Sequence, residues 1–271
     1  MRKLILSAVV LVLLAAVVRL ITLTVSTTPA RAENLPFDDT LRRIRIPTLM
    51  YHYVSAPPAD SDKYRIDLSV NPSNFRQQLE WLKANDYHTI SMDQFIGALK
   101  RGDELPSNPV LLTFDDGYID AYTQAFPLLK EYGFVGTFFV VTDWIDQQRG
   151  GYLTWDQVEE MARAGMSIHS HSRQHLDVRD RDEAWFTYQI AATYDTLEAH
   201  VGKQYRVFCY PSGQLDDATV QRLAQIGVVA AFTTHDGTIA TSDASMLTLP
   251  RVRMRNTTTV QDFAHLLAWV R

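Results

Sequence analysis

From residue 46 onward, short apolar runs alternate with longer segments in which apolar and polar residues recur at helical spacing. Short runs that are apolar throughout are typical of strands buried on both faces. The runs predict strands at 47–52, 88–91, 109–114, 136–141, 166–171, 206–210, 228–233 and 247–254.

The intervening segments carry an apolar residue at every third or fourth position, which is the pattern of an amphipathic helix. Several of them begin at a capping residue, such as Asn71, Ser91 or Thr154, and several end at a glycine. The pattern predicts a loop at 55–65 and helices after 71–74 and at about 91–102, 121–132, 154–165, 181–201, 218–226 and 260–270.

Strands of this kind, separated by helices, imply a parallel sheet that is covered on both sides. Six or seven such units favour a closed or nearly closed (β/α) barrel, with an open doubly wound sheet as the alternative. We therefore expect residues 46–271 to form one catalytic domain, preceded by a lead-in segment at 33–45. Polar residues at the carboxyl ends of the strands should then meet on one rim.

The N-terminal segment has the pattern of an export signal. Arg2 and Lys3 precede an apolar run at 4–18, which continues at 20–25 and is followed by Ala30-Arg31-Ala32. Residues 1–32 are thus predicted to be a signal peptide or an uncleaved membrane anchor, since the apolar stretch nearly reaches the length that spans a bilayer. Either interpretation places the remaining chain in the periplasm, on the cell surface or outside the cell.

Composition excludes several classes of function. The net charge of −5 and the absence of clustered Lys and Arg argue against a nucleic-acid partner. Cys209 is the only cysteine, so an intramolecular disulfide and a thiolate metal cluster are impossible. Because Cys209 lies in an apolar strand-like run, we expect it to be a small buried core residue.

Two adjacent acids, Asp115 and Asp116, end the apolar run at 109–114 and precede Gly117. A simple turn is one interpretation, because Asp-Gly is a common turn pair. However, neighbouring side chains on a strand point in different directions, so one acid can bind a metal while the other handles a proton.

A second polar cluster contains His171 and His175, which are four positions apart and can reach one metal from a turn. Spacing alone also permits His169 and His171 as the pair, because they share a strand face. One carboxylate and two imidazoles would make a three-ligand site with positions open for water and substrate. A metal held there would lower the pKa of its water and polarise a carbonyl group.

These segments resemble the polysaccharide deacetylases of the NodB-homology type, carbohydrate esterase family 4. The first family motif, Thr-Phe-Asp-Asp-Gly, is matched by residues 113–117, and the second, His-Ser/Thr-x-x-His, by residues 171–175. The similarity continues in the segments 49–52, 136–139, 153–155, 210–213 and 249–251.

The resemblance implies a distorted (β/α) barrel of about seven units. It implies that Asp116, His171 and His175 hold a divalent metal and that Asp115 is the general base. Zn²⁺ is favoured, with Co²⁺, Ni²⁺ and Mn²⁺ as alternatives for such a ligand set. The implied reaction is attack of metal-activated water on an acetyl carbonyl, with the oxyanion stabilised by the metal and by a backbone N–H near Tyr210.

The chain departs from the family pattern at two places. Many members carry an arginine that orients the base where this chain has Cys209, and Arg251 is the candidate replacement from another strand. A structural salt bridge is the alternative role for Arg251. No Leu-x-His motif, which carries the usual general acid, occurs near the C-terminus, so His235 is a weak candidate acid, with His52 as a second candidate.

We therefore expect a metal-dependent hydrolase that removes N-acetyl groups from a cell-wall polysaccharide or exopolysaccharide containing N-acetylglucosamine. Tyr118, Trp155 and Tyr210 are candidates for contact with sugar faces, although Trp155 could equally be a core residue. The alternatives are a catalytically impaired glycan-binding protein with the same fold, and a metal hydrolase acting on a non-sugar amide or an O-acetyl ester.

Overall fold

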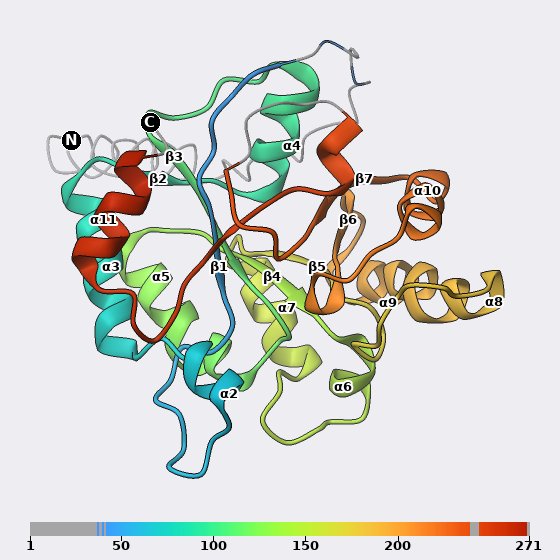
Figure 1. Cartoon of the computed structure of the whole chain (residues 1–271), viewed down its shortest axis with the longest axis horizontal. Coiled ribbons are helices and arrows are strands. Elements are labelled where there is room, and N and C mark those ends of the chain that lie inside the picture. The colour runs from blue at the N-terminus through green and yellow to red at the C-terminus, as the bar shows by residue number, and fades with distance from the viewer. Residues whose placement is uncertain (1–36, 38–39, 41, 239–243, 270–271) are drawn as a thin grey trace, which may run out of the picture. The chain divides into compact units, whose positions relative to one another are not determined.

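The computed structural model describes residues 37, 40, 42–238 and 244–269 (Figure 1). The predicted signal peptide or anchor at 1–32 lies outside these residues. Within the described residues, no helix has both the length and the apolar character needed to cross a bilayer.

The described strands form one parallel sheet in the order β7-β6-β5-β4-β3-β1-β8, with β2 paired to β3. Most lie within the apolar runs of the sequence, and the sheet curls with helices on its outer side (Figure 1). The prediction of a distorted (β/α) barrel is therefore confirmed. The strands are β1 Thr48–Tyr51, β2 His88–Thr89, β3 Pro109–Phe114, β4 Thr137–Val140, β5 Ser167–Ser170, β6 Arg206–Cys209, β7 Val228–Phe232 and β8 Val252–Arg253.

The segment just before β8 joins the two ends of the sheet. Leu249 forms a parallel bridge with Phe232 of β7, and the N–H of Arg251 donates to the carbonyl of His235 at 2.9 Å. The next residue, Val252, begins β8, which pairs with β1. The predicted strand at 247–254 is thus wrong in extent, because a 3₁₀ turn at Ala244–Leu247 precedes this single bridge.

Helices follow the strands and surround the sheet (Figure 1). Asn71 caps one of them through its side chain, and Ser91 and Thr154 each form a capping box, as their residue types predict. The helices are α2 Lys63–Asp67, α3 Pro72–Ala84, α4 Met92–Arg101, α5 Phe126–Tyr132, α6 Thr142–Asp146, α7 Trp155–Arg163, α8 Glu183–Phe186, α9 Ala192–Val201, α10 Asp217–Gln225 and α11 Val260–Trp269.

Two predicted helices are interrupted by a π-helical turn. The helix predicted at 121–132 consists of a π turn at Ala121–Ala125 and then α5, whose second residue is Pro127. Proline has no N–H to donate to the preceding turn, which favours the wider turn there. The helix predicted at 181–201 divides into α8, a π turn at Thr187–Ala191, and α9.

Two apolar layers hold the barrel in shape. On its outer side, Phe114 of β3 stacks between Tyr51 and Phe138 of the neighbouring strands. Inside the barrel, Phe139 and Phe232 pack against each other with their ring centroids 5.5 Å apart. The interior is therefore filled with side chains, which leaves polar residues to gather at its carboxyl end.

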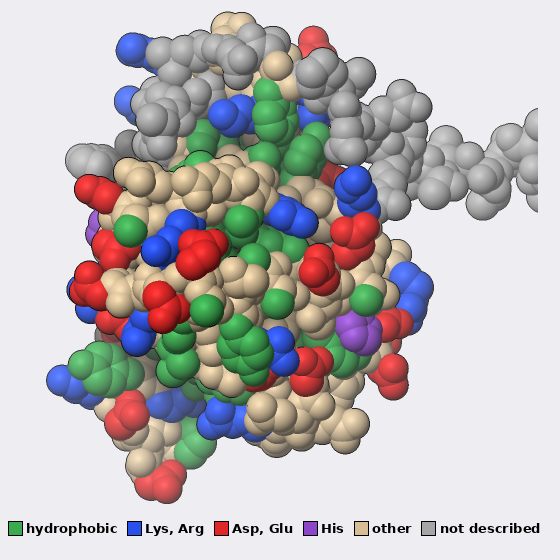
Figure 2. Space-filling view, turned by 90° about the vertical axis from the view of Figure 1, so that its right-hand side faces the viewer, with side chains coloured by type: hydrophobic (Ala, Val, Ile, Leu, Met, Phe, Trp, Pro, Cys, Tyr) green, Lys and Arg blue, Asp and Glu red, His purple; other side chains and the backbone are tan. Residues whose placement is uncertain are grey.

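The outer surface has mixed charge on the side shown in Figure 2, where Lys and Arg are interspersed with Asp and Glu. The apolar side chains that are most exposed belong to the segments that follow β1 and β5. They are Tyr64, Ile66, Leu176 and Tyr188.

Candidate metal centre

The carboxyl ends of the strands surround a cavity of about 560 Å³. It is lined by residues from six separate parts of the chain, which the parallel sheet brings to one rim. The lining residues are His52, Tyr64, Leu68, Asp115, Asp116, Tyr118, His171, His175, Tyr210, Ser212, Gln214, Thr234 and Arg253.

The turn after β3 directs its two acids to different partners. The N–H of Asp115 still donates to the carbonyl of Tyr51, so this residue continues the sheet. Asp116 and Gly117 then both adopt φ of +73°, in the left-handed region. This conformation is costly for a residue that has a Cβ atom, and such strain often marks functional sites. The turn sends Asp115 toward the barrel interior and Asp116 toward the histidines.

The loop after β5 places two imidazoles on one oxygen. Nε2 of His171 lies 3.1 Å from Oδ1 of Asp116, and Nε2 of His175 lies 3.2 Å from the same atom. Nevertheless, this buried oxygen forms no hydrogen bond of acceptable geometry. Burial alone would raise the pKa of Asp116, but the two imidazoles hold it well below its ordinary value.

The loop is held in place by several hydrogen bonds. The N–H of His175 donates to Oγ of Ser172 at 3.0 Å, and both residues have positive φ. Between them, Gln174 donates to the carboxylate of Asp143 and accepts from Gln189, both at 2.7 Å. These bonds fix a strained loop and thereby orient the His175 ring.

The donor set fits a divalent metal. Nδ1 of His171 lies 2.8 Å from the carbonyl oxygen of Cys209, which can only accept a hydrogen bond. The proton of the neutral ring is therefore on Nδ1, which leaves the lone pair of Nε2 directed at Asp116. This is the arrangement found for metal-ligating histidines. Asp116, His171 and His175 offer ligand atoms that all lie within 4.8 Å of one another.

The second acid, Asp115, is held by a buried arginine. Arg251 donates from Nη1 to Oδ1 and from Nη2 to Oδ2 of Asp115, both at 2.7 Å, and is itself 0% exposed. Two of its other donors bind Oγ1 of Thr113 and the carbonyl of Thr233, both at 3.0 Å. Burial raises the pKa of Asp115, but the charge of Arg251 more than offsets this effect, so the pKa lies below its ordinary value.

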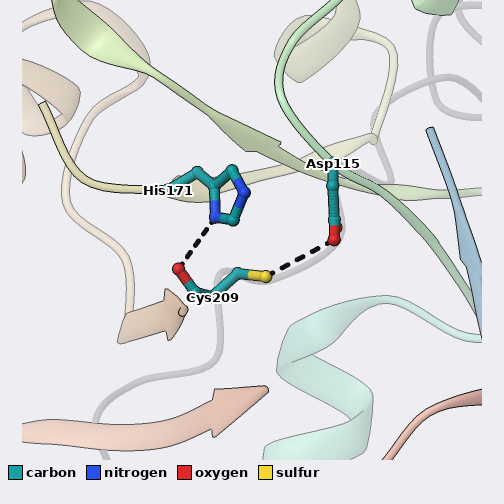
Figure 3. Close-up of side chains that lie close together, drawn as sticks. All are labelled: Asp115, His171 and Cys209. Carbon is teal, nitrogen blue, oxygen red and sulfur yellow. Dashed lines mark hydrogen bonds between the residues drawn. The ribbon is translucent and has the colours of Figure 1, made fainter. Parts of the chain in front are cut away.

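Cys209 is buried, as expected, but it also contacts the site. Figure 3 shows its sulfur directed at Asp115 and its carbonyl oxygen at His171. The thiol donates to Oδ2 of Asp115 at 3.6 Å and accepts from Nη2 of Arg251 at 3.1 Å. Cys209 therefore contacts both Asp115 and Arg251, although only its place in the family motif pointed to it in the sequence.

Of the two candidate acids, only His52 lies in the site. Its Nε2 is 3.8 Å from Oδ2 of Asp115, and its buried Nδ1 has no hydrogen-bond partner among the described residues. Burial lowers the pKa of His52, against the opposing effect of the two carboxylates. By contrast, His235 is exposed and does not line the cavity, because the chain turns outward after β7.

The structure also separates His169 from the metal centre. His169 lies deeper on β5, beside Phe139, and lines a different, small cavity. Burial lowers its pKa to about 3. Of the two pairings that spacing allowed, the structure brings His171 and His175 together on Asp116.

Of the three predicted sugar-contact residues, two line the cavity and one does not. Tyr118 lines the cavity and stacks on Tyr53 with their ring centroids 3.7 Å apart. Tyr210 also lines it, but its hydroxyl donates to the carbonyl of Leu247 at 3.0 Å. Trp155 does not line it, because its ring packs on His200 at 3.9 Å. The structure therefore places Trp155 outside the cavity lining, where it is partly buried against the core.

The resemblance implied that a backbone N–H near Tyr210 binds the oxyanion, which stays a prediction. The N–H of Tyr210 donates to the carbonyl of Phe232 at 3.0 Å and is therefore occupied. The following turn, Pro211–Gly213, instead presents Ser212 to the cavity, with φ of +54°. Sequence reasoning also missed Arg253, which lines the cavity at the end of β8. Alternation along the strand from Arg251 is the signal that could have indicated it.

The family comparison agrees with this geometry. The polysaccharide deacetylase family model matches residues 102–231. YxkH of Bacillus subtilis, whose name describes it as a polysaccharide deacetylase, is 30% identical over 210 residues, which cover 78% of this chain and 71% of that protein. The chain belongs to the polysaccharide deacetylase family and is an enzyme of that class, a hydrolase.

Two further relatives extend the comparison. The Streptococcus pyogenes deacetylase PplD, solved in complex with acetate, has a TM-score of 0.76 and 30% identity, covering 83% of this chain and 99% of that one. The poly-beta-1,6-N-acetyl-D-glucosamine N-deacetylase of Escherichia coli K12 is 29% identical over 245 residues. That match covers 75% of this chain but only 36% of the E. coli protein.

Proposed function

We propose that this enzyme is a metal-dependent N-deacetylase of a polysaccharide that contains N-acetylglucosamine. The proposal depends on one observation: a set of metal-binding side chains and an ionised carboxylate line the same cavity. The Asp116, His171 and His175 donor set lies beside a carboxylate, Asp115, that Arg251 keeps ionised. Hydrolysis of an amide needs both a polarised carbonyl and a base for the attacking water.

Asp116, His171 and His175 would hold the metal. When bound, a divalent ion of the Zn²⁺ type supplies a Lewis acid that polarises the acetyl carbonyl and lowers the pKa of the attacking water. Co²⁺, Ni²⁺ and Mn²⁺ also suit one carboxylate and two imidazoles.

Asp115 would take the proton from water as general base. Its low pKa keeps it deprotonated at neutral pH, and the two bonds from Arg251 fix the orientation of its carboxylate. The same carboxylate lies 3.8 Å from His52. The proton can therefore pass from Asp115 to the His52 ring and on to the leaving nitrogen, with hydrogen bonds that shorten once substrate is bound.

The substrate proposal combines the lining of the cavity with the names of the relatives. Tyr64 and Tyr118 offer aromatic surface in the lining of the cavity, which suits the apolar face of a sugar ring. The name of the E. coli relative specifies a poly-β-1,6-linked N-acetylglucosamine substrate. We therefore propose an acetylated amino-sugar polymer as partner, with the β-1,6-linked polymer as the first to test.

An extracytoplasmic location follows from the N-terminal sequence. The basic start, apolar centre and Ala-x-Ala site of residues 1–32 support export, and an uncleaved segment would anchor the enzyme to the membrane. Such a location would give the enzyme access to cell-wall or exported polysaccharide.

The decisive experiment measures acetate release from β-linked N-acetylglucosamine oligomers by the Zn²⁺-loaded protein. We expect turnover in the native enzyme and none above background in Asp115→Asn, which should still bind the metal because Asp115 is not a ligand. Asp177→Asn is the matched control, since this partly exposed residue pairs only with its local arginine. Tight oligomer binding without acetate release would instead indicate a catalytically impaired glycan-binding protein.

A further inference from the structure

Arg253, at the end of β8, is a second arginine that faces the site. It lies two positions after Arg251, so the alternation of the strand points both side chains to the same side of the sheet. Arg251 is fully buried beneath the cavity, whereas Arg253 is half-buried and lines the cavity near His52 and Leu68. The two arginines therefore occupy different depths of one barrel interior.

Unlike that of Arg251, the side chain of Arg253 forms no hydrogen bond or ion pair with any residue that the structure describes. The two acids whose charges act on it are already engaged. Asp115 is bound by Arg251, and Asp67 pairs with Arg255. Because arginine stays protonated in proteins, the wall of the cavity carries a positive charge that no group among the described residues neutralises through an ion pair.

Among the described residues that line the cavity, no further acid balances this charge. Two carboxylates are present there, of which Asp115 is neutralised by Arg251 and Asp116 belongs to the proposed metal centre. A bound divalent ion would make the site more positive still. In a partly enclosed cavity, such a charge acts on a ligand more strongly than it would in open water.

We propose that Arg253 is a specificity-determining residue, which makes the enzyme discriminate against a free amino sugar next to the N-acetylglucosamine that reacts. The proposal rests on the proposed function. Deacetylation converts a neutral acetamide into an amine that is protonated near neutral pH, and the ammonium is repelled by the guanidinium. An acetylated neighbour is not repelled, and its carbonyl oxygen can accept a hydrogen bond from Arg253.

This charge effect has a consequence for the product. Each turnover would make the adjacent sugar a poorer substrate, because the new ammonium would then lie beside Arg253 when the enzyme moves along the chain. Free amino groups in the product should therefore be spaced apart, with fewer adjacent pairs than random deacetylation would leave. Neutralising Arg253 should remove this spacing.

The test compares two β-1,6-linked oligomers, one fully acetylated and one with a single glucosamine beside the reacting sugar, at a pH at which the amine is protonated. The measured quantity is the ratio of kcat/KM for the acetylated oligomer to that for the mixed one. We expect Arg253→Gln to lower this ratio on the order of fivefold, as the loss of one nearby charge predicts. Arg253→Glu should lower it roughly twenty-five-fold, because the charge change doubles and the energy enters an exponent.

Two further variants serve as controls. Arg253→Lys keeps the charge and should keep the ratio, and so should Arg163→Gln, which removes an exposed arginine on α7 that lies outside the cavity lining. A ratio that stays within twofold in both Arg253→Gln and Arg253→Glu would overturn the proposal.

The same ratio can be measured as affinity in an Asp115→Asn background, which separates this proposal from the proposed function. An affinity ratio that shifts with the charge at position 253, without acetate release by the native enzyme, would support the role of Arg253 and refute the deacetylase assignment. If the native enzyme releases acetate but neither the kcat/KM ratio nor the affinity ratio changes with the charge at position 253, the deacetylase assignment stands and the role of Arg253 is refuted. Failure of both oligomers to bind would refute both.

Discussion

The guanidinium of Arg251 and the carboxylate of Asp115 are 136 positions apart in the sequence, yet they meet through two parallel hydrogen bonds of 2.7 Å. The pair is almost completely excluded from solvent, with side-chain exposures of 0% and 2%. Bidentate pairing of this kind fixes the plane of the carboxylate as well as its charge. Arg251 thus fixes the orientation of Asp115, the proposed base, at the place where the barrel closes.

Replacing Arg251 by Gln should destabilise the fold by about 3–5 kcal/mol at neutral pH, because it leaves the carboxylate of Asp115 buried without its partner. In the native enzyme the pKa of Asp115 is lowered, so the pair stabilises the fold above the ordinary carboxyl pKa, and this contribution is lost on acidification. In the variant, burial alone would raise that pKa.

The stability difference between the native enzyme and the Arg251→Gln variant should therefore shrink as the pH falls. Urea unfolding at several pH values measures it, and any residual activity should show its acidic limb moved to higher pH. Arg255→Gln, which breaks the exposed pair with Asp67, should cost about 0–1 kcal/mol. Similar costs for the two variants would contradict the role of Arg251.

Zn²⁺ should stabilise the folded enzyme by about 2.7 kcal/mol when its free concentration is a hundred times its dissociation constant. The metal would also stabilise a strained turn and loop, since Asp116 and His175 both hold positive φ. His171→Ala should abolish the rise in Tm on addition of Zn²⁺. His200→Ala should retain it, because His200 packs on Trp155 outside the cavity. Loss of the rise in both variants would point to metal binding elsewhere.

His52→Gln should lower kcat by roughly 10²–10⁴-fold, which is the usual contribution of a positioned acid or base. His235→Gln should leave kcat unchanged, since this exposed residue does not line the cavity. The two variants thus distinguish between the candidate acids with one assay of acetate release, together with a metal-content measurement that confirms an intact site. A large loss of kcat in His235→Gln alone would reverse the assignment.

Cys209 should resist alkylation by iodoacetamide until the protein unfolds. The side chain is 0% exposed, and burial raises the pKa of the thiol well above its ordinary value, so little reactive thiolate forms. Mass spectrometry of the native and the denatured protein measures the extent of labelling at this single cysteine. Rapid labelling of the native protein would show that the interior beside Asp115 opens readily.

Gly213→Ala should disturb the cavity as well as the backbone. Gly213 has φ of +70°, and an added Cβ would lie 2.1 Å from Oγ1 of Thr234, which lines the cavity. Gly227 has a similar φ of +77°, but an added Cβ there would meet nothing within 4 Å. Gly227→Ala should therefore cost only the left-handed backbone strain of about 1–2 kcal/mol.

Thermal unfolding and kcat/KM of the two glycine variants distinguish the effect of backbone strain from the effect of the steric clash with Thr234. We expect Gly213→Ala to be the less stable of the two and to lose activity, whereas Gly227→Ala keeps it. Equal stability and activity would show that Thr234 moves aside without consequence for the site.

The alternation of strands and helices was predictable because it follows from local periodicity, and most of the predicted elements are present. The exceptions depend on the tertiary structure or on single residues. The π turn before α5 accompanies Pro127, which lacks an N–H. The strand predicted at 247–254 is shortened because the sheet has only a brief partner for it on each side. The hydrophobic pattern alone does not show whether an extended residue is hydrogen-bonded to a neighbouring strand.

The sequence by itself determined the groups that lie close along the chain. Asp115 and Asp116 share one turn, and His171 and His175 share one short loop, so local backbone geometry sets their separation. Only the tertiary structure decided that Arg251 binds Asp115, that His52 lies beside it while His235 is exposed, and that Trp155 packs on His200 away from the cavity. Such contacts depend on which strands pair and on the side to which each residue points, and these are set by packing summed over the whole barrel.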